Sequence, residues 1–183
     1  MKKKAKIIIL ISGISGAGKT VIVNGLIEHR KSVYMRPVSY TTRDKREEEP
    51  RGEYIFVDKE WLMEEYRLGR VMNLDYVYGN YYSVSKTDII NIWQKGMIPI
   101  KEVHPENISK FKNQDINCIS ILIKRELNEI KNRGYERFVD DFTYYNKLSD
   151  NKFNLIIENN SIEDAIMQID SFIMKLFKHK LQI

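Results

Sequence analysis

The stretch "IIILISGISGAGKT", residues 7–20, decides the fold class of this chain. It joins an apolar run to a glycine-rich segment, and in the residues after it, 19–30, apolar side chains recur at helical spacing. A continuous apolar run is typical of a strand that is buried on both faces. Strand, glycine loop and helix in this order predict the opening of an α/β unit with a parallel sheet.

The glycine-rich segment matches the pattern G-x-x-x-x-G-K-[ST]. Its glycines let backbone N–H groups turn toward an anion, while Lys19 offers a cation to the β and γ phosphates and Thr20 a hydroxyl to Mg²⁺. An incidental glycine turn is the alternative, which the strand and helix on either side disfavour. We therefore predict a site for a nucleoside triphosphate and Mg²⁺. Its residues are Gly13, Ser15, Gly16, Ala17, Gly18, Lys19 and Thr20, with Thr20 as the metal ligand.

Composition limits the remaining possibilities. The chain has 183 residues, 43% of them hydrophobic, which suits one globular domain. No apolar run has the roughly 20 residues needed to cross a bilayer. The start "MKKKAKIIILISG" resembles a signal peptide only superficially, because its apolar part is short and has no small-residue cleavage site. Cys118 is the single cysteine, so we expect no internal disulfide, a packed thiol and a cytoplasmic location.

The net charge of +5 favours an anionic partner, which could be nucleic acid or a small polyanion. The basic residues do not form one long tract interleaved with aromatic residues, as a nucleic-acid groove would require. Several lie beside short motifs instead, which favours small phosphorylated ligands over nucleic acid. Nothing in the sequence indicates an oligomeric state.

A second candidate anion site lies in "VSYTTRDKR", residues 38–46. Ser39, Thr42, Arg43 and Arg46 fall within eight residues of one another, and two guanidinium groups with hydroxyls beside them can grip a phosphate. From these residues alone, a solvated loop with its arginines paired to neighbouring acids is an equal alternative.

Periodicity and turn residues predict the other elements. Pro37, Pro50 and Gly52 make residues 36–57 irregular or edge structure, and a hairpin turn falls at Gly79–Asn80. Strands are expected at 33–35, 97–103, 116–123 and 152–159, and helices at 58–69 (capped by Asp58), 86–96, 124–148 in large part, and 161–183 (opened by Ser161 and Asp164).

Four segments in this order, "GISGAGKT", "SYTTRDKR", "GEYIFV" and "GNYYSV", resemble the guanylate kinase family in sequence and spacing. The resemblance implies a P-loop NTPase-type parallel sheet core flanked by helices. It also implies one kinase domain over residues 1–183. Its parts would be a core of 1–35, 96–123 and 148–183, a monophosphate-binding insertion of 36–95 and a helical lid of 124–147.

The resemblance also implies roles for individual residues. The acceptor's phosphate would be held by Ser39, Arg43, Arg46, Tyr54 and Tyr82, although core packing is the alternative for the two tyrosines. The catalytic cations would be Lys19, Arg43, Arg133 and Arg137, and Asn159 would belong to the adenine-side loop.

The chain departs from the family where the base is recognised. Asn73 stands in place of a glutamate, Val84 in place of a serine and Ser83 in place of a glycine. An amide supplies one acceptor and one donor where a carboxylate supplies two acceptors, although Asp75 lies close enough in sequence to compensate. Glu102 keeps one carboxylate of a family D-x-D pattern, next to the acceptor, while His104 replaces the second.

We therefore expect ATP-dependent phosphoryl transfer to a nucleoside monophosphate, with GMP or dGMP as the first candidates. The open alternatives are a related kinase acting on a phosphorylated sugar such as ribose 1,5-bisphosphate, a non-catalytic guanylate-kinase-like binding module, and a nucleic-acid end kinase. The intact "GAGKT" argues against the binding module.

Overall fold

The computed structural model describes residues 6–45, 54–77, 79–112, 116–125, 145 and 150–181, without the side chains of 179–181. Arg46, Arg133, Arg137 and most of the expected lid are not among these residues, so the predictions for them lie outside the described residues.

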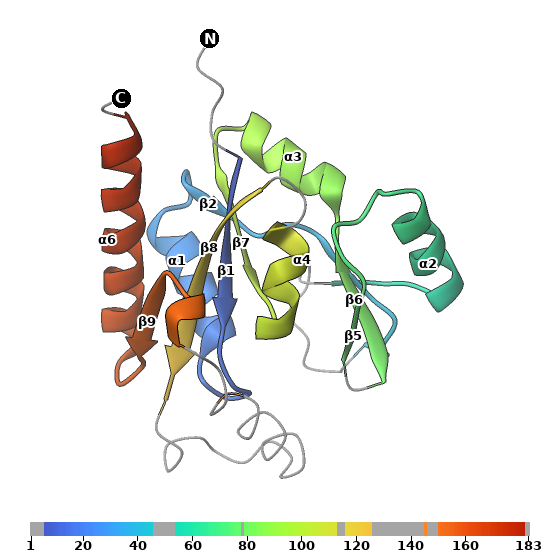
Figure 1. Ribbon diagram of the computed structural model, residues 1–183, viewed down its shortest axis with the longest axis horizontal. Helices are drawn as coiled ribbons and strands as arrows, with labels where there is room; N and C mark the ends of the chain where they lie inside the picture. The colour runs from blue at the N-terminus through green and yellow to red at the C-terminus, as the bar shows by residue number, and fades with distance from the viewer. Residues whose placement is uncertain are drawn as a thin grey trace. The chain divides into compact units, whose positions relative to one another are not determined.

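Two sheets carry the described fold (Figure 1). The five-stranded sheet has the order β2-β7-β1-β8-β9, and the four-stranded sheet has the order β4-β3-β6-β5. The strands of the first are β1 (Ile7–Ser12), β2 (Tyr34–Met35), β7 (Ile98–Glu102), β8 (Asn117–Lys124) and β9 (Leu155–Glu158). Those of the second are β3 (Ser39–Thr41), β4 (Tyr54–Phe56), β5 (Asp75–Val77) and β6 (Asn80–Val84). The helices are α1 (Lys19–His29), α2 (Lys59–Arg67), α3 (Lys86–Gln94), α4 (Ile108–Lys112) and α6 (Ile162–Leu181), with 3₁₀ turns η1 (Pro105–Asn107) and η3 (Asp150–Lys152).

The five-stranded sheet explains the apolar runs of the sequence. All six residues of β1 are buried, as expected for a strand covered on both faces. The β2–β7 and β8–β9 pairs are parallel, with Tyr34 opposite Ile98 and Leu122 opposite Ile156. The predicted α/β class with a parallel sheet is therefore confirmed.

Contacts divide the chain into two compact units, which are described separately. The first comprises Met1–Ile8, Ser32–Lys101 and Glu106–Cys118, and the second comprises Ile9–Lys31, Glu102–Pro105 and Ile119–Ile183. The partition into core, insertion and lid that the sequence suggests stays a prediction.

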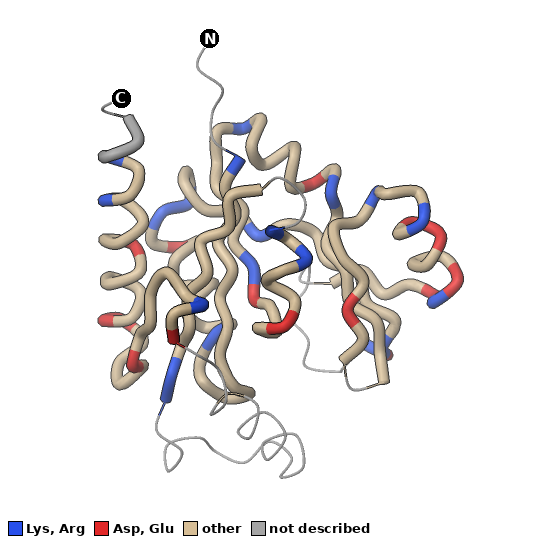
Figure 2. Tube along the Cα trace, viewed as in Figure 1, with Lys and Arg blue, Asp and Glu red and all other residues tan. Residues whose placement is uncertain are grey.

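The first unit contains the four-stranded sheet, in which β3 is central. It pairs in parallel with β4 and antiparallel with β6, and β5 and β6 form the predicted hairpin at Gly79, whose φ is 80°. Helix α2 buries Leu62 and carries charges of both signs on its exposed side (Figure 2). Asp58 is its N-cap, but its side chain makes no capping hydrogen bond, so the expected side-chain cap is wrong.

Two other helices of this unit differ in how well the sequence predicted them. Helix α3 lies where periodicity placed it, and its start is capped by Ser85, whose Oγ accepts a hydrogen bond from Asp88 N at 3.1 Å. Helix α4 was not predicted, because five residues are too short for a periodic pattern. Its Phe111 is fully buried.

The single cysteine also lies in this unit, at the start of β8. Cys118 is half-buried, and burial raises the pKa of its thiol to about 11, an effect that the charge of Lys112 partly offsets. The thiol therefore stays protonated at neutral pH, in agreement with the packed side chain expected from the sequence.

The second unit is built on the contact between α1 and α6 (Figure 1). Gly25 makes this approach close, since a Cβ there would lie 2.2 Å from Ile166 Cδ1. Helix α6 buries Ala165, Ile169 and Ile173, which recur at helical spacing along one face. The predicted cap is also present, because Asp164 N donates to Ser161 Oγ at 3.3 Å. No helix among the described residues is both long and apolar enough to span a membrane.

An ion pair joins the C-terminal end of α1 to the middle of α6. The Asp170 side chain is only 5% exposed and accepts a hydrogen bond from Arg30 Nε at 2.6 Å, while His29 Nε2 lies 3.8 Å from its other oxygen. The Arg30 side chain is 40% exposed. Removing the arginine would leave a buried carboxylate without its nearest cation, and that is more costly than losing an exposed pair.

We predict that Arg30→Met lowers the free energy of unfolding by about 2–3 kcal/mol. The matched control is Lys31→Met. Lys31 pairs with Glu28 at 2.5 Å, but both side chains are at least 70% exposed, so we expect a cost below about 1 kcal/mol. Urea unfolding followed by circular dichroism measures both values. Equal costs would contradict this account of the Arg30–Asp170 pair.

Candidate functional site

The glycine loop between β1 and α1 has the backbone geometry that its sequence predicts. Gly13, Gly16 and Gly18 have φ values of 156°, 84° and 92°. A Cβ at Gly13 would lie 2.5 Å from Ile123 O, and one at Gly18 would lie 2.7 Å from Asn159 Nδ2. Positive φ and close neighbours together restrict positions 13 and 18 to glycine.

Lys19 folds its side chain back over this loop. Its Nζ donates to Gly13 O at 2.6 Å and to Ile14 O at 2.8 Å, which keeps the ammonium group beside the backbone that would bind an anion. Thr20 is exposed in the first turn of α1, so its hydroxyl is accessible to a metal ion. No group of three or more His, Cys, Asp or Glu side chains in the described ranges could hold a metal. The Thr20 hydroxyl is the kind of oxygen ligand that Mg²⁺ takes together with phosphate oxygens and waters.

Asn159, predicted as a cofactor residue, lies against the loop. Its Nδ2 donates to Ala17 O at 2.7 Å, and its buried Oδ1 has no hydrogen-bond partner among the described residues. The side chain thus ties the end of β9 to the phosphate loop.

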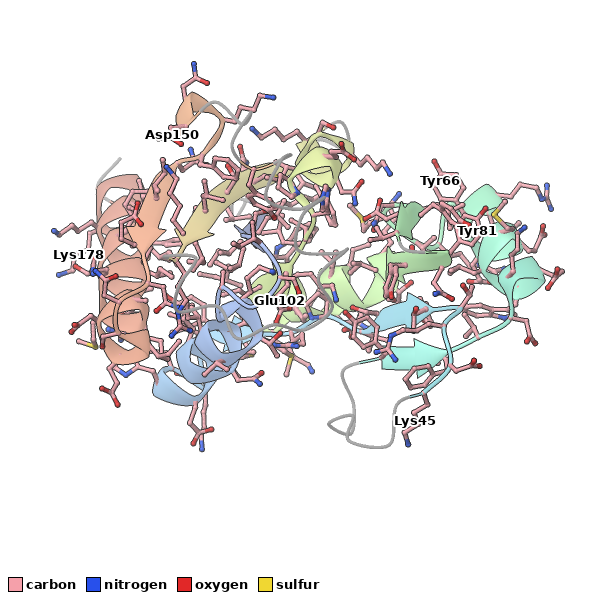
Figure 3. All side chains as sticks on the ribbon, turned by 90° about the horizontal axis from the view of Figure 1, so that it is seen from below. Lys45, Tyr66, Tyr81, Glu102, Asp150 and Lys178 are labelled. Atoms are coloured by element: carbon pink, nitrogen blue, oxygen red, sulfur yellow. The ribbon has the colours of Figure 1, made fainter. Side chains whose placement is uncertain are left out.

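Tyr145 contacts the loop as well, and the sequence analysis missed it. Gly13 N donates to the Tyr145 hydroxyl at 3.0 Å, and the His104 ring lies edge-on to Tyr145 with centroids 6.3 Å apart. No sequence signal separates this tyrosine from the other ten. Glu102 belongs to the same unit, at the end of β7 (Figure 3). Next to it, Val103 accepts a hydrogen bond from Ser12 Oγ at 2.9 Å.

Four of the residues expected to hold the acceptor's phosphate come together on the second sheet. Ser39 lies opposite Tyr54 in the β3–β4 pair, and the rings of Tyr54 and Tyr82 meet edge-on at 6.1 Å. The Arg43 guanidinium carbon lies 5.2 Å from the centre of the Tyr54 ring and 5.3 Å from that of Phe56. Both tyrosines are only half-buried, and their assignment to the acceptor's phosphate stays a prediction.

Lys101 joins this group, and the sequence analysis did not single it out. Its side chain is buried on β7, its Nζ lies 2.5 Å from Ser39 Oγ, and the same atom lies 4.9 Å from the centre of the Tyr54 ring. The available signal was a lysine inside the otherwise apolar strand "IPIKE", because charged residues are seldom buried without a specific partner.

The residues expected to recognise the base are linked by hydrogen bonds in the interior, and the exposed Lys110 joins them from the surface. Asn73 Nδ2 donates to Asp75 Oδ2 at 2.6 Å, and Lys110 Nζ donates to Asp75 Oδ1 at 2.7 Å. Asn73 Oδ1 is buried and has no hydrogen-bond partner in the described part of the chain. Ser83 Oγ donates to the Asn73 carbonyl oxygen, while Val84 is buried opposite Ser39.

A glycine loop of this geometry, between a buried strand and a helix of a parallel α/β sheet, is typical of P-loop nucleotide-binding proteins. The sequence profile of one family, guanylate kinase, matches residues 4–176. The chain belongs to the guanylate kinase family and is a phosphotransferase of the nucleoside monophosphate kinase class. The family and the enzyme class expected from the sequence are thus confirmed.

Individual relatives support the same assignment. A guanylate kinase of Clostridium tetani is 31% identical over 180 residues, which cover 91% of this chain and 85% of the relative. One from Clostridium perfringens is 30% identical over 94% of this chain and 85% of its own length. The fold is shared with the crystal structure of guanylate kinase from Anaplasma phagocytophilum, which superimposes with a TM-score of 0.76 at 23% identity, over 94% of this chain and 87% of that one.

We predict that Gly18→Ala weakens binding of a non-hydrolysable ATP analogue at least tenfold, because a Cβ at this position forces the loop away from Asn159. Gly69→Ala is the matched control. Gly69 also has a positive φ, 67°, but its Cβ would meet nothing within 4 Å, so we expect about 1 kcal/mol of destabilisation and unchanged binding. Isothermal titration calorimetry compares the two. Unchanged binding by Gly18→Ala would contradict the assignment of the loop.

Proposed function

We propose that the protein transfers the γ-phosphoryl group of ATP to GMP or dGMP and releases ADP and the nucleoside diphosphate. The observation that carries this choice of acceptor is the buried Asn73 Oδ1, a hydrogen-bond acceptor with no partner among the described residues. Buried polar atoms are nearly always hydrogen-bonded, so a ligand that brings an N–H group to this oxygen satisfies it.

The orientation of the Asn73 amide follows from its neighbour. A carboxylate only accepts hydrogen bonds, so the side of the amide that faces Asp75 must be the NH₂ group. The amide oxygen must then face the other way. Lys110 fixes Asp75 in turn. Asn73 therefore offers a fixed acceptor, although the isolated residue could present either end.

A fixed acceptor favours guanine over adenine. Guanine carries N–H groups at N1 and at its 2-amino group, whereas N1 of adenine is itself an acceptor and would repel the amide oxygen. Val84 gives guanine O6 no hydrogen-bond donor, so one contact that would strengthen discrimination is missing. We infer a preference for guanine that depends mainly on the N1 edge.

The acceptor's phosphate is assigned to Ser39, Arg43, Tyr54 and Tyr82, whose hydroxyl and guanidinium groups suit a dianion. The assignment of Arg46 to the same phosphate remains a prediction. In the reaction, an oxygen of this phosphate attacks the γ-phosphorus of ATP, and the bond from that phosphorus to the β–γ bridging oxygen breaks. The acceptor is already anionic and needs no general base.

Charge neutralisation is the main task of the protein side chains in this mechanism. Lys19 moves its hydrogen bonds from the loop carbonyls to the β and γ phosphates, and the loop N–H groups bind the same oxygens. Thr20 would ligate the Mg²⁺, which supplies further positive charge to the phosphates when bound. Arg133 and Arg137 remain predicted cations for the transferring group.

A coupled assay of ADP release over a panel of acceptors tests the proposal. We predict GMP and dGMP as the best substrates, IMP within about tenfold of GMP because it retains N1–H, and AMP weaker than GMP by a hundredfold or more. Ribose 1,5-bisphosphate, CMP and UMP complete the panel. Stronger turnover with any of these three or with AMP than with GMP would overturn the choice of acceptor.

A second prediction concerns the amide orientation. Asp75→Asn replaces the carboxylate by an amide, which pairs with Asn73 in either direction, so the ratio of kcat/KM for GMP to that for AMP should fall about tenfold. Lys110→Met is the matched control, because it removes the ion pair but keeps the carboxylate that orients Asn73, and the ratio should stay close to that of the unmodified protein. An unchanged ratio in Asp75→Asn would contradict this account of base recognition.

A further inference from the structure

Lys101 is a buried lysine of β7 that contacts the residues expected to hold the acceptor's phosphate. The family resemblance assigns no role to this position. Lys101 is 6% exposed, and Ser39, whose Oγ its Nζ contacts at 2.5 Å, is 1% exposed. The ammonium also lies 4.9 Å from the centre of the Tyr54 ring. These contacts place a cation inside the cluster that the proposed function assigns to the acceptor.

We propose that Lys101 is a further binding residue for the acceptor's phosphate, where it adds a positive charge to that of Arg43. This inference rests on the proposed function, because it takes Ser39, Tyr54 and Tyr82 as groups that contact this phosphate. The ligand class is a dianionic phosphomonoester.

Two cations on one aromatic ring are the first argument. The Arg43 guanidinium carbon and the Lys101 ammonium lie 5.2 and 4.9 Å from the centre of the same Tyr54 ring. Each cation is attracted to the ring's π-electrons, but the two cations repel each other. A dianion within reach of both cations attracts each of them and outweighs their mutual repulsion. This attraction is strong in a partly buried site because the effective dielectric constant is low.

The direction of the Ser39 hydrogen bond is the second argument. A lysine ammonium has donors only, so Ser39 Oγ must accept from Lys101. The hydroxyl hydrogen then points elsewhere, and within the described protein Pro37 O accepts it at a long 3.4 Å. A phosphate oxygen at normal hydrogen-bond distance competes well with so long a contact. Lys101 thus makes Ser39 a donor toward the ligand.

The experiment compares two ligands that differ only in the phosphate. Calorimetric titration with GMP and with guanosine separates the contribution of the phosphate from that of the base. For Lys101→Met, which keeps the length and apolar stem of the side chain, we expect GMP affinity to fall by about 10- to 100-fold and guanosine affinity to change by less than about twofold. Binding of an ATP analogue at the glycine loop should not change.

Two further variants make the result specific. Lys95→Met removes the same charge from an exposed position in the same unit, so it should leave the GMP-to-guanosine ratio unchanged. Lys101→Arg keeps the charge, so its ratio of GMP affinity to guanosine affinity should be close to that of the unmodified protein. This variant remains informative if Lys101→Met does not fold. Higher salt should lower the ratio of GMP affinity to guanosine affinity, and it should do so more in the unmodified protein than in Lys101→Met.

The outcomes distinguish this inference from the proposed function. Equal weakening of GMP and guanosine in Lys101→Met, or no weakening of GMP, would overturn the role of Lys101. Preference for another acceptor in the assay panel would overturn the choice of GMP and leave the inference about Lys101 standing. The same variants would then be titrated with inorganic phosphate and followed by ³¹P NMR, where a weaker interaction is expected in Lys101→Met alone. Equal interaction in all variants would reject the inference.

Discussion

The close approach of the glycine loop to its neighbours is the constraint on which the nucleotide site depends. Gly13 leaves no room for a Cβ beside Ile123 O, and Gly18 leaves none beside Asn159. Asn159 in turn donates to Ala17 O, so β8 and β9 fix the loop from outside its own sequence. N–H groups that are held in place before a phosphate arrives need no ordering on binding, and that makes them effective electrostatic catalysts.

In and beside the four-stranded sheet, polar side chains are arranged so that each hydrogen bond has a defined donor and a defined acceptor. Lys110 holds Asp75, and Asp75 holds the amide of Asn73. Lys101 holds the hydroxyl of Ser39 in the same way. In each case a side chain that can only donate or only accept decides the direction of the next hydrogen bond. The Asn73 amide thereby presents an acceptor and the Ser39 hydroxyl a donor, as the proposed recognition of base and phosphate requires.

The site was only partly predictable from the sequence, and the omissions have a common cause. Ser39, Arg43 and Tyr54 belong to short motifs that resemble those of the guanylate kinase family, so the resemblance singled them out before their positions in space were known. Lys101 and Tyr145 belong to no motif, and each acts through a contact with a residue more than 60 positions away. Asn73 was recognised as a departure from the family, but the orientation of its amide depends on the hydrogen bond to Asp75, which the sequence does not specify.

The sequence by itself determined the α/β class, the glycine loop, the order of most strands and helices, and the family. Local patterns encode these features, because a buried parallel strand needs a continuous apolar run and a phosphate loop needs glycines at fixed spacing. Only the tertiary structure decided which polar atoms face one another, and hence which end of the Asn73 amide is presented and that Lys101 lies beside Ser39. Hydrogen bonds act over about 3 Å, so their partners depend on how distant strands pack and leave no local pattern in the sequence.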